Sequence, residues 1–352
     1  MRVLDRSEVH DEAVKRIHDE TMIIDIHTDI AYDVERQREY GRKRIIENDY
    51  LPDLEAGGVN VIVSSIFVDN KDLPEMALRK ALNQISAIYA DIEESSEKLK
   101  LCKRYKDIEQ AKHEGKVGVL LSFEGVEPLH KDLSLLKIFY ELGVRMMGIT
   151  WSRRNYAADG ALYGPNDHNI GSGLTDFGVS LIQEAVKYGM IIDVSHLNDR
   201  GFWDVVNLMD KPFIASHSDC RKLVNIGRNL SDDQIKMIAE RNGVTGINAI
   251  NVIAVNEGEE ESMERLADHI DYIVQMVGPA HVGLGLDLND KLVKYLSPEQ
   301  LRILPRPVKD IMKGYYELPA LTEILLKRGY RESDISMIYG ENMARIFREI
   351  LV

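Results

Sequence analysis

The chain has little of what disulfide-bonded, redox-active or membrane-spanning proteins require. It contains two cysteines in 352 residues, Cys102 and Cys220, which are too few for a disulfide framework and form no Cys-x-x-Cys pair. It has no uncharged apolar run of about 18 residues, the length that a membrane-spanning helix needs. Its first residues, MRVLDRSEVHDE, lack the apolar core of a secretory signal. We therefore expect a soluble, cytoplasmic protein.

The sequence is also short of positive charge. It has 44 lysine and arginine residues against 58 aspartate and glutamate residues, a formal net charge of −14. This balance disfavours general binding to nucleic acid or to an anionic membrane. Neither GxGxxG nor GxxxxGKS/T, the glycine-rich signatures of nucleotide binding, follows an apolar run. No nucleic-acid, membrane or nucleotide partner is expected.

Eight short apolar, β-branched runs alternate with longer stretches of helical period. Several helical stretches end in glycine directly before the next run, which is a helix C-cap signal. This alternation is typical of parallel α/β architecture, and eight strands suit a closed (β/α)8 TIM barrel. An open doubly wound sheet is the alternative. The expected strands span residues 22–28, 59–68, 117–124, 143–150, 189–196, 212–217, 243–249 and 281–287.

We expect residues 1–352 to form a single (β/α)8 domain, because one barrel of this kind can take up the whole length. A helix is expected at about residues 8–20, and the C-terminal pattern indicates further helices over about residues 318–351. Both segments are expected to pack on the barrel.

Potential metal ligands and acid–base groups stand at the ends of several expected strands. In a (β/α)8 barrel, the carboxyl ends of the strands form the face that holds the active site. Residues i and i+2 of a strand point the same way, so His27 and Asp29 in IIDIHTDI can reach one ion. The full set is His27, Asp29, Glu124, His196, His217 and Asp287.

This mixture of residue types suits a divalent metal. Neutral imidazole and carboxylate together bind zinc or a similar borderline ion. These ligands exceed the needs of one tetrahedral zinc, whereas two metals sharing Glu124 would use them all. Such a pair can hold a hydroxide and polarise a carbonyl oxygen. Taken singly, each histidine could be a hydrogen-bonded core residue and each acid a helix cap, but their shared position favours a metal site.

Several segments together resemble the renal (membrane) dipeptidase family of zinc hydrolases, within the amidohydrolase-like barrels. The resemblance runs from about residue 20 to the end of the chain. It implies a metal-dependent hydrolase that cleaves dipeptides, with L-Xaa-D-Xaa dipeptides among the candidates, and that forms a homodimer. The segments are DIHTDI, SFEGVEPL, YELGVRMMGITW, IIDVSHLND, ASHSDCRKLVNIGRNLSDDQI and VGLGLDL.

The same resemblance implies a role for each site residue. His27 and Asp29 match ligands of a first zinc, His196 and His217 match ligands of a second, and Glu124 matches the bridging carboxylate. Two Zn²⁺ ions are therefore the expected cofactors.

Two further residues match groups that act on the substrate. Arg228 in IGRNLSDD matches the arginine that holds the substrate carboxylate, a task suited to a bidentate guanidinium. Asp287 matches the aspartate that takes a proton from the attacking water and passes it to the leaving amine.

The sequence departs from the family pattern at two places. Trp151 stands where the best-known members have a histidine that contacts the substrate carbonyl, and indole can donate one hydrogen bond but accept none. Trp151 is expected to contact the substrate, with Arg153, Arg154 or Asn155 as alternative donors; Asn155 is included among the expected substrate-binding residues. In GLDLND, Asn289 replaces a second acid.

The residues leave other functions open. The same machinery could cleave another amide, such as an N-acyl amino acid or a β-lactam, and Trp151 motivates this alternative. A catalytically inactive metal-binding barrel and a metal-free open-sheet binding protein are further alternatives. The strand at 143–150 ends without lysine, so a carbamylated lysine bridging two metals is not expected there.

Overall fold

The computed structural model describes residues 6–164 and 171–352; residues 1–5 and 165–170, which the single-domain prediction also covers, lie outside the described residues. Its strands form one parallel sheet in the order β6-β5-β4-β2-β1-β8-β7, with β3 paired to β4 beside this path. The strands are Ile23–Thr28 (β1), Val59–Phe67 (β2), Leu99–Leu101 (β3), Val117–Glu124 (β4), Val144–Gly148 (β5), Ile191–Asp193 (β6), Thr245–Ile247 (β7) and Val282–Leu284 (β8).

The sheet curls until its two outer strands meet the segment at residues 214 and 215. Asp193 of β6 forms a parallel bridge with Ile214, and Thr245 of β7 forms one with Ala215. The Ile214 N–H donates to the Ile192 carbonyl at 3.0 Å, which continues the sheet across this junction. The strands therefore close into a ring, and the expected (β/α)8 barrel is confirmed.

The strands differ from the predicted set at two places. Residues 212–217 make only isolated bridges, because the backbone N–H groups of Ser216 and His217 donate to side chains instead of a neighbouring strand. The short strand β3 was not expected. It pairs with Val117–Val119 of β4, and β5 takes over as the neighbour from Leu121 onward.

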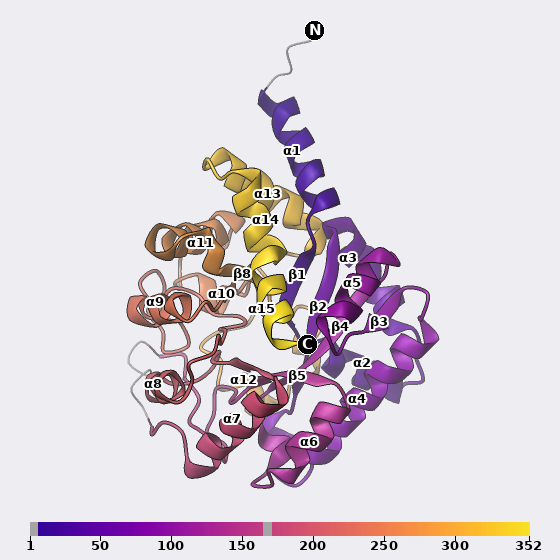
Figure 1. Ribbon diagram of the computed structural model, residues 1–352, viewed down its shortest axis with the longest axis vertical. Coiled ribbons are helices and arrows are strands. Elements are labelled where there is room, and N and C mark those ends of the chain that lie inside the picture. The colour runs from indigo at the N-terminus through magenta and orange to yellow at the C-terminus, as the bar shows by residue number, and fades with distance from the viewer. Residues whose placement is uncertain (1–5, 165–170) are drawn as a thin grey trace.

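Helices surround the barrel (Figure 1). In α4, the buried residues Ala81, Ile85, Ile88 and Ile92 recur every three or four positions, which gives the helix one apolar face toward the sheet. No helix of the described residues combines the length and hydropathy needed to cross a membrane. The α-helices are Arg6–Glu20 (α1), Ile30–Glu39 (α2), Leu51–Gly57 (α3), Ala77–Glu94 (α4), Tyr105–His113 (α5), Ser134–Glu141 (α6), Asp176–Tyr188 (α7), Asp199–Leu208 (α8), Asp232–Glu240 (α9), Asn251–Ala254 (α10), Met263–Val277 (α11), Pro298–Leu301 (α12), Leu318–Lys327 (α13), Glu332–Ser336 (α14) and Asn342–Ile350 (α15).

The last helix, α15, lies across the strands near the centre of the barrel (Figure 1). Its residues Met343 and Phe347 join a buried cluster with Ile24 and Ile26 of β1. A Cβ on Gly340, just before α15, would lie 1.7 Å from the Met22 carbonyl oxygen, so only glycine allows this approach to the start of β1. The amino-terminal end of the barrel is thereby filled, which leaves the opposite face for a site.

Candidate metal centre

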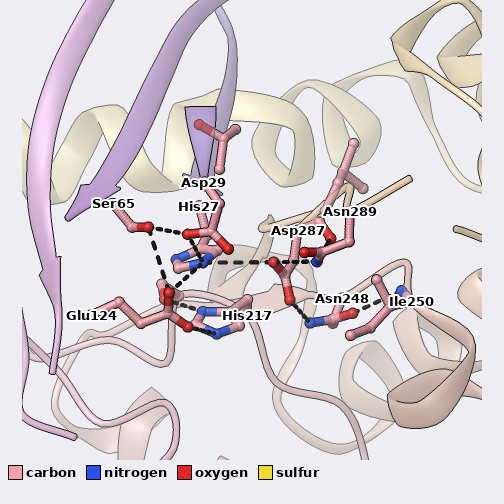
Figure 2. A network of polar contacts seen from close by, with 12 residues as sticks. His27, Asp29, Ser65, Glu124, His217, Asn248, Ile250, Asp287 and Asn289 are labelled. Atoms are coloured by element: carbon pink, nitrogen blue, oxygen red, sulfur yellow. Dashed lines mark hydrogen bonds and ion pairs between the residues drawn. The ribbon is translucent and has the colours of Figure 1, made fainter. Parts of the chain in front are cut away.

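The six predicted residues gather at the carboxyl-terminal face of the barrel, and Figure 2 shows five of them around a common centre. His27 lies in β1, Asp29 directly follows it at the N-cap of α2, and Glu124 ends β4. The other three, His196, His217 and Asp287, follow β6, the 214–215 bridges and β8. The structure therefore brings all six residues together at one face.

The Nε2 atom of His27 lies between three carboxylates. It is 3.8 Å from Asp29 Oδ1, 3.8 Å from Glu124 Oε2 and 3.7 Å from Asp287 Oδ1. This nitrogen is buried and has no hydrogen-bond partner among the described residues. A buried polar atom without a partner is costly and requires an explanation. A divalent cation held by the nitrogen and the nearby carboxylates provides one.

Glu124 connects this group to the other two histidines. Its Oε1 lies 3.1 Å from His196 Nε2 and 3.7 Å from His217 Nε2, and the two nitrogens are 2.9 Å apart. Its Oε2 faces His27, and Ser65 of β2 donates to Asp29 on that side. One carboxylate therefore lies between two sets of potential metal ligands.

Burial makes this cluster electrostatically unfavourable without a cation. Burial raises the pKa of Glu124 and of Asp287 well above the usual range, and the negative charge of Asp29 raises both pKa values further. Burial also lowers the pKa of the three histidines, so their imidazoles are neutral and able to bind a metal. The residues present fit a site for divalent metal.

Serine hydroxyls behind the histidines determine which nitrogen faces the site. Ser216 Oγ donates to Asp193 Oδ2 at 2.5 Å and lies 2.6 Å from His217 Nδ1. Because the hydroxyl hydrogen points to Asp193, His217 Nδ1 must donate to Ser216, and Nε2 presents its lone pair to the cluster. Ser152 Oγ lies 2.8 Å from His196 Nδ1 in the corresponding position. Such partners orient metal-binding histidines.

Two asparagines hold the carboxylate of Asp287 (Figure 2). Asn248 donates to Asp287 Oδ2 and Asn289 donates to Asp287 Oδ1, each at 3.0 Å. The Ile250 N–H donates to Asn248 Oδ1 at 2.8 Å and thereby fixes the amide orientation. Sequence reasoning missed Asn248, although its place near the end of the expected strand 243–249 was a usable signal.

Two of the six residues have a left-handed backbone. The φ angles are 68° at His196 and 54° at Asp287, values that residues other than glycine seldom adopt. Both residues follow the last regular position of a strand, where the chain turns its side chain toward the cluster. Unfavourable backbone angles of this kind concentrate at functional sites.

Arg228 is buried beside His217. It donates to Ser218 Oγ and to the His217 carbonyl, each at 2.7 Å, and its Nε is buried with no partner among the described residues. Burial lowers the pKa of the guanidinium. A pocket opens above the cluster, with Asp29, Glu124, His196 and Asp287 among its lining residues, and Arg228 is not one of the described residues that line it. Its positive charge nevertheless lies next to His217.

Trp151 lines that pocket, and Asn155 does not. The Trp151 ring lies 5.8 Å from the His196 ring and 5.7 Å from the Phe67 ring. The Asn155 amide donates to the Ile149 carbonyl at 2.7 Å and accepts from the N–H groups of Ala157 and Ala158. Asn155 thus organises its own loop and lines a separate surface pocket.

The two arginines near Trp151 also have partners. Arg153 donates to Glu127, Asn70 and the Val68 carbonyl. Arg154 donates to Asp159. Of the four expected substrate-contacting candidates in this loop, Trp151 is therefore the one that lines the pocket above the cluster.

Comparison with known proteins agrees with this geometry. A protein encoded in the PQQ-III 3′ region of Acinetobacter calcoaceticus is 33% identical over 189 residues, which are 52% of this chain and 60% of that protein. Dipeptidase tcpJ of Claviceps purpurea is 26% identical over 274 residues, 78% of this chain and 60% of that protein. The matches thus span about three fifths of both relatives.

A solved structure covers nearly the whole chain. It is a metallo peptidase from Rhodobacter sphaeroides liganded with a phosphinate mimic of the dipeptide L-Ala-D-Ala, with a TM-score of 0.82 and 25% identity over 95% of this chain and 100% of that one. Residues 11–351 match the family model described as membrane dipeptidase, peptidase family M19. The chain therefore belongs to the membrane dipeptidase family, peptidase family M19.

Proposed function

We propose that this protein is a zinc-dependent dipeptidase with a binuclear metal site. The observation that carries the proposal is the position of Glu124, whose two oxygens face His27 on one side and His196 and His217 on the other. Family membership supports dipeptide hydrolysis. The related metallo peptidase that binds a mimic of L-Ala-D-Ala supports dipeptides, including L,D dipeptides, as the substrate class.

The metal ions are assigned to the residues at hand. His27 and Asp29 would hold one ion, His196 and His217 the other, and Glu124 both. Bound zinc supplies Lewis acidity, which polarises a carbonyl oxygen and lowers the pKa of water. The serines behind His196 and His217 keep the imidazoles oriented toward the ions.

Two residues of the chain act on the substrate in this proposal. Asp287 accepts a proton from the attacking water and delivers it to the departing amine. Its carboxylate is held on both oxygens by amide donors, so it is positioned before the substrate arrives. Arg228 attracts the substrate carboxylate with a buried positive charge whose Nε is unpaired among the described residues.

Release of free amino acids from a panel of L,L and L,D dipeptides by zinc-loaded protein tests this function. Turnover that a Glu124→Ala variant loses would establish the dipeptidase. Two bound metals per chain without turnover of any dipeptide would contradict it, and N-acyl amino acids and β-lactams would then be the next substrates. Trp151 favours that second candidate, because it replaces a histidine at the expected substrate carbonyl.

Asn248 is expected to contribute to turnover through Asp287. Replacing Asn248 with alanine should lower kcat about 10- to 100-fold, with KM and metal content close to wild type, because the hydrogen bond that positions Asp287 Oδ2 is lost. Steady-state kinetics and metal analysis measure the two quantities. An unchanged kcat, or a loss of metal that accounts for the lower rate, would contradict this role.

The homodimer, the cytoplasmic location and the single-domain organisation remain predictions from the sequence. Sedimentation analysis of the purified chain would measure the first of these.

A further inference from the structure

A pocket lies above the metal centre. Among the described residues that line it, the acidic residues and the histidine lie only at its base. Its base carries Asp29, Glu124, His196 and Asp287. The walls are apolar or aromatic, apart from two neutral amides. We infer that this pocket selects dipeptides whose side chain entering it is uncharged and apolar. The inference rests on the proposed function and specifies its substrate class.

One wall is built around Trp151. Trp151 and Phe67 pack edge to face, and Leu296 packs against the same cluster. Arg153 lies over both rings, at 5.3 and 5.5 Å from their centroids, but its guanidinium is already bonded to three other groups. This wall therefore offers a substrate apolar surface and no free charge.

The other wall joins the end of β7 to the segment after β8. Tyr163 and Ile250 form a buried cluster, against which Leu304 and Val308 pack. All four residues line the pocket. Residues 293–308 therefore bring apolar side chains to both walls and cover the metal centre like a cap.

Hydrogen bonds hold this cap, residues 293–308, in place. Asp69, fully buried two residues after β2, accepts from the Ser297 N–H at 2.9 Å and from its hydroxyl at 2.5 Å. Arg306 donates to the carbonyl groups of Asn251 and Val255 at 2.8 and 2.6 Å. Because the cap is anchored near both ends, its apolar residues are positioned before a ligand binds.

A charged side chain would find no opposite charge in these walls. The two amides are neutral, and each already makes a hydrogen bond, since Asn289 donates to Asp287 and Gln300 accepts from the Asn70 N–H. The carboxylates of the base are assigned to metal binding and proton transfer, so they do not balance an added ammonium group. Burying an unpaired charge is far less favourable than burying an alkyl chain of the same size.

The test compares dipeptides with norleucine, lysine or glutamate at each position in turn, because norleucine and lysine have nearly the same length. At one position or both, the wild-type kcat/KM should favour norleucine over lysine and glutamate by at least about 100-fold. Equal kcat/KM, within about threefold, for all three residues at both positions would overturn the inference.

A matched pair of variants tests whether the cap determines the selectivity. Leu304→Glu should raise kcat/KM for the lysine dipeptide relative to norleucine at least about tenfold, because the new carboxylate pairs with the ammonium. Leu301→Glu, three residues earlier in the same segment but 39% exposed and outside the pocket lining, should leave the ratio unchanged. Equal lysine-to-norleucine ratios of kcat/KM in both variants would show that the cap does not determine the selectivity.

Calorimetric binding of phosphinate isosteres of the norleucine and lysine dipeptides separates this inference from the proposed function. Preferential binding of the norleucine isostere without turnover of any dipeptide would retain the pocket selectivity and reject the dipeptidase. Equal binding with measurable turnover would retain the dipeptidase and reject the selectivity. No binding and no turnover would reject both.

Discussion

Replacing Glu124 with glutamine is expected to lower dipeptide turnover at least about 1,000-fold and to reduce bound metal below two ions per chain. Groups that merely support metal ligands cost about 10–100-fold when removed, and Glu124 is placed as a ligand to both ions. Glutamine keeps the shape of the side chain but loses its negative charge. Metal content by mass spectrometry and kcat from amino acid release measure the two effects.

The exposed residue Glu109 in α5 offers the matched control. Glu109→Gln removes the same charge from the chain without touching the cluster, so its turnover and metal content should equal wild type. A Glu124→Gln protein that retains two ions and near-normal kcat would show that the two metals are not bridged by this residue.

The same substitution should act in the opposite direction on the metal-free protein. Without cations, burial raises the pKa of Glu124, and the negative charges of Asp29 and Asp287 raise it further. Glutamine removes the cost of burying this carboxyl group, so the metal-free variant should unfold at a temperature equal to or above that of metal-free wild type. Added zinc should raise the unfolding temperature of wild type more than that of the variant, because stabilisation by a ligand grows with the logarithm of its affinity for the folded state. Activity and metal-free stability are therefore opposed at this position.

The grouping of the six candidate residues could be predicted from the sequence because strand geometry constrains their positions. His27 and Asp29 are two residues apart at a strand end, and Glu124 ends a continuous apolar run. Parallel strands bring their carboxyl ends to one face, so side chains far apart in sequence become neighbours. His196 and His217 required no more than this rule, even though neither lies within a regular strand.

The supporting residues were not accessible in the same way. The Ser216 hydroxyl donates a hydrogen bond to Asp193, 23 residues away in the sequence, and the Asn248 amide donates one to Asp287, 39 residues away. Serine and asparagine are common in loops, so neither residue type carries a specific signal by itself, and only the place of Asn248 near an expected strand end pointed to it. Asn155 illustrates the converse problem. Its proximity to Trp151 in sequence suggested a substrate contact, but its amide is used to fold the loop.

Replacing Asp287 with asparagine is expected to lower kcat about 10²- to 10⁴-fold while two metal ions stay bound. The side chain keeps its size, but an amide cannot take a proton from water and pass it to an amine. KM should change little, since Asp287 is assigned to proton transfer and not to holding the substrate. Kinetics, metal analysis and thermal unfolding of the same preparation measure the outcome. Asp233→Asn, in α9 with a side chain that is 82% exposed, is the control and should match wild type.

The geometry allows a competing role for Asp287 that this experiment separates. Its Oδ1 lies 3.7 Å from His27 Nε2, nearly the same distance as Asp29 Oδ1 at 3.8 Å, so both carboxylates are placed to bind the ion at His27. A metal ligand and a proton carrier differ in what their loss removes. If Asp287→Asn loses an ion along with activity, Asp287 is a ligand. If both ions remain and the rate falls, Asp287 carries the proton. The hydrogen bonds that the Asn248 and Asn289 amides donate then serve to hold this base in place beside the metals.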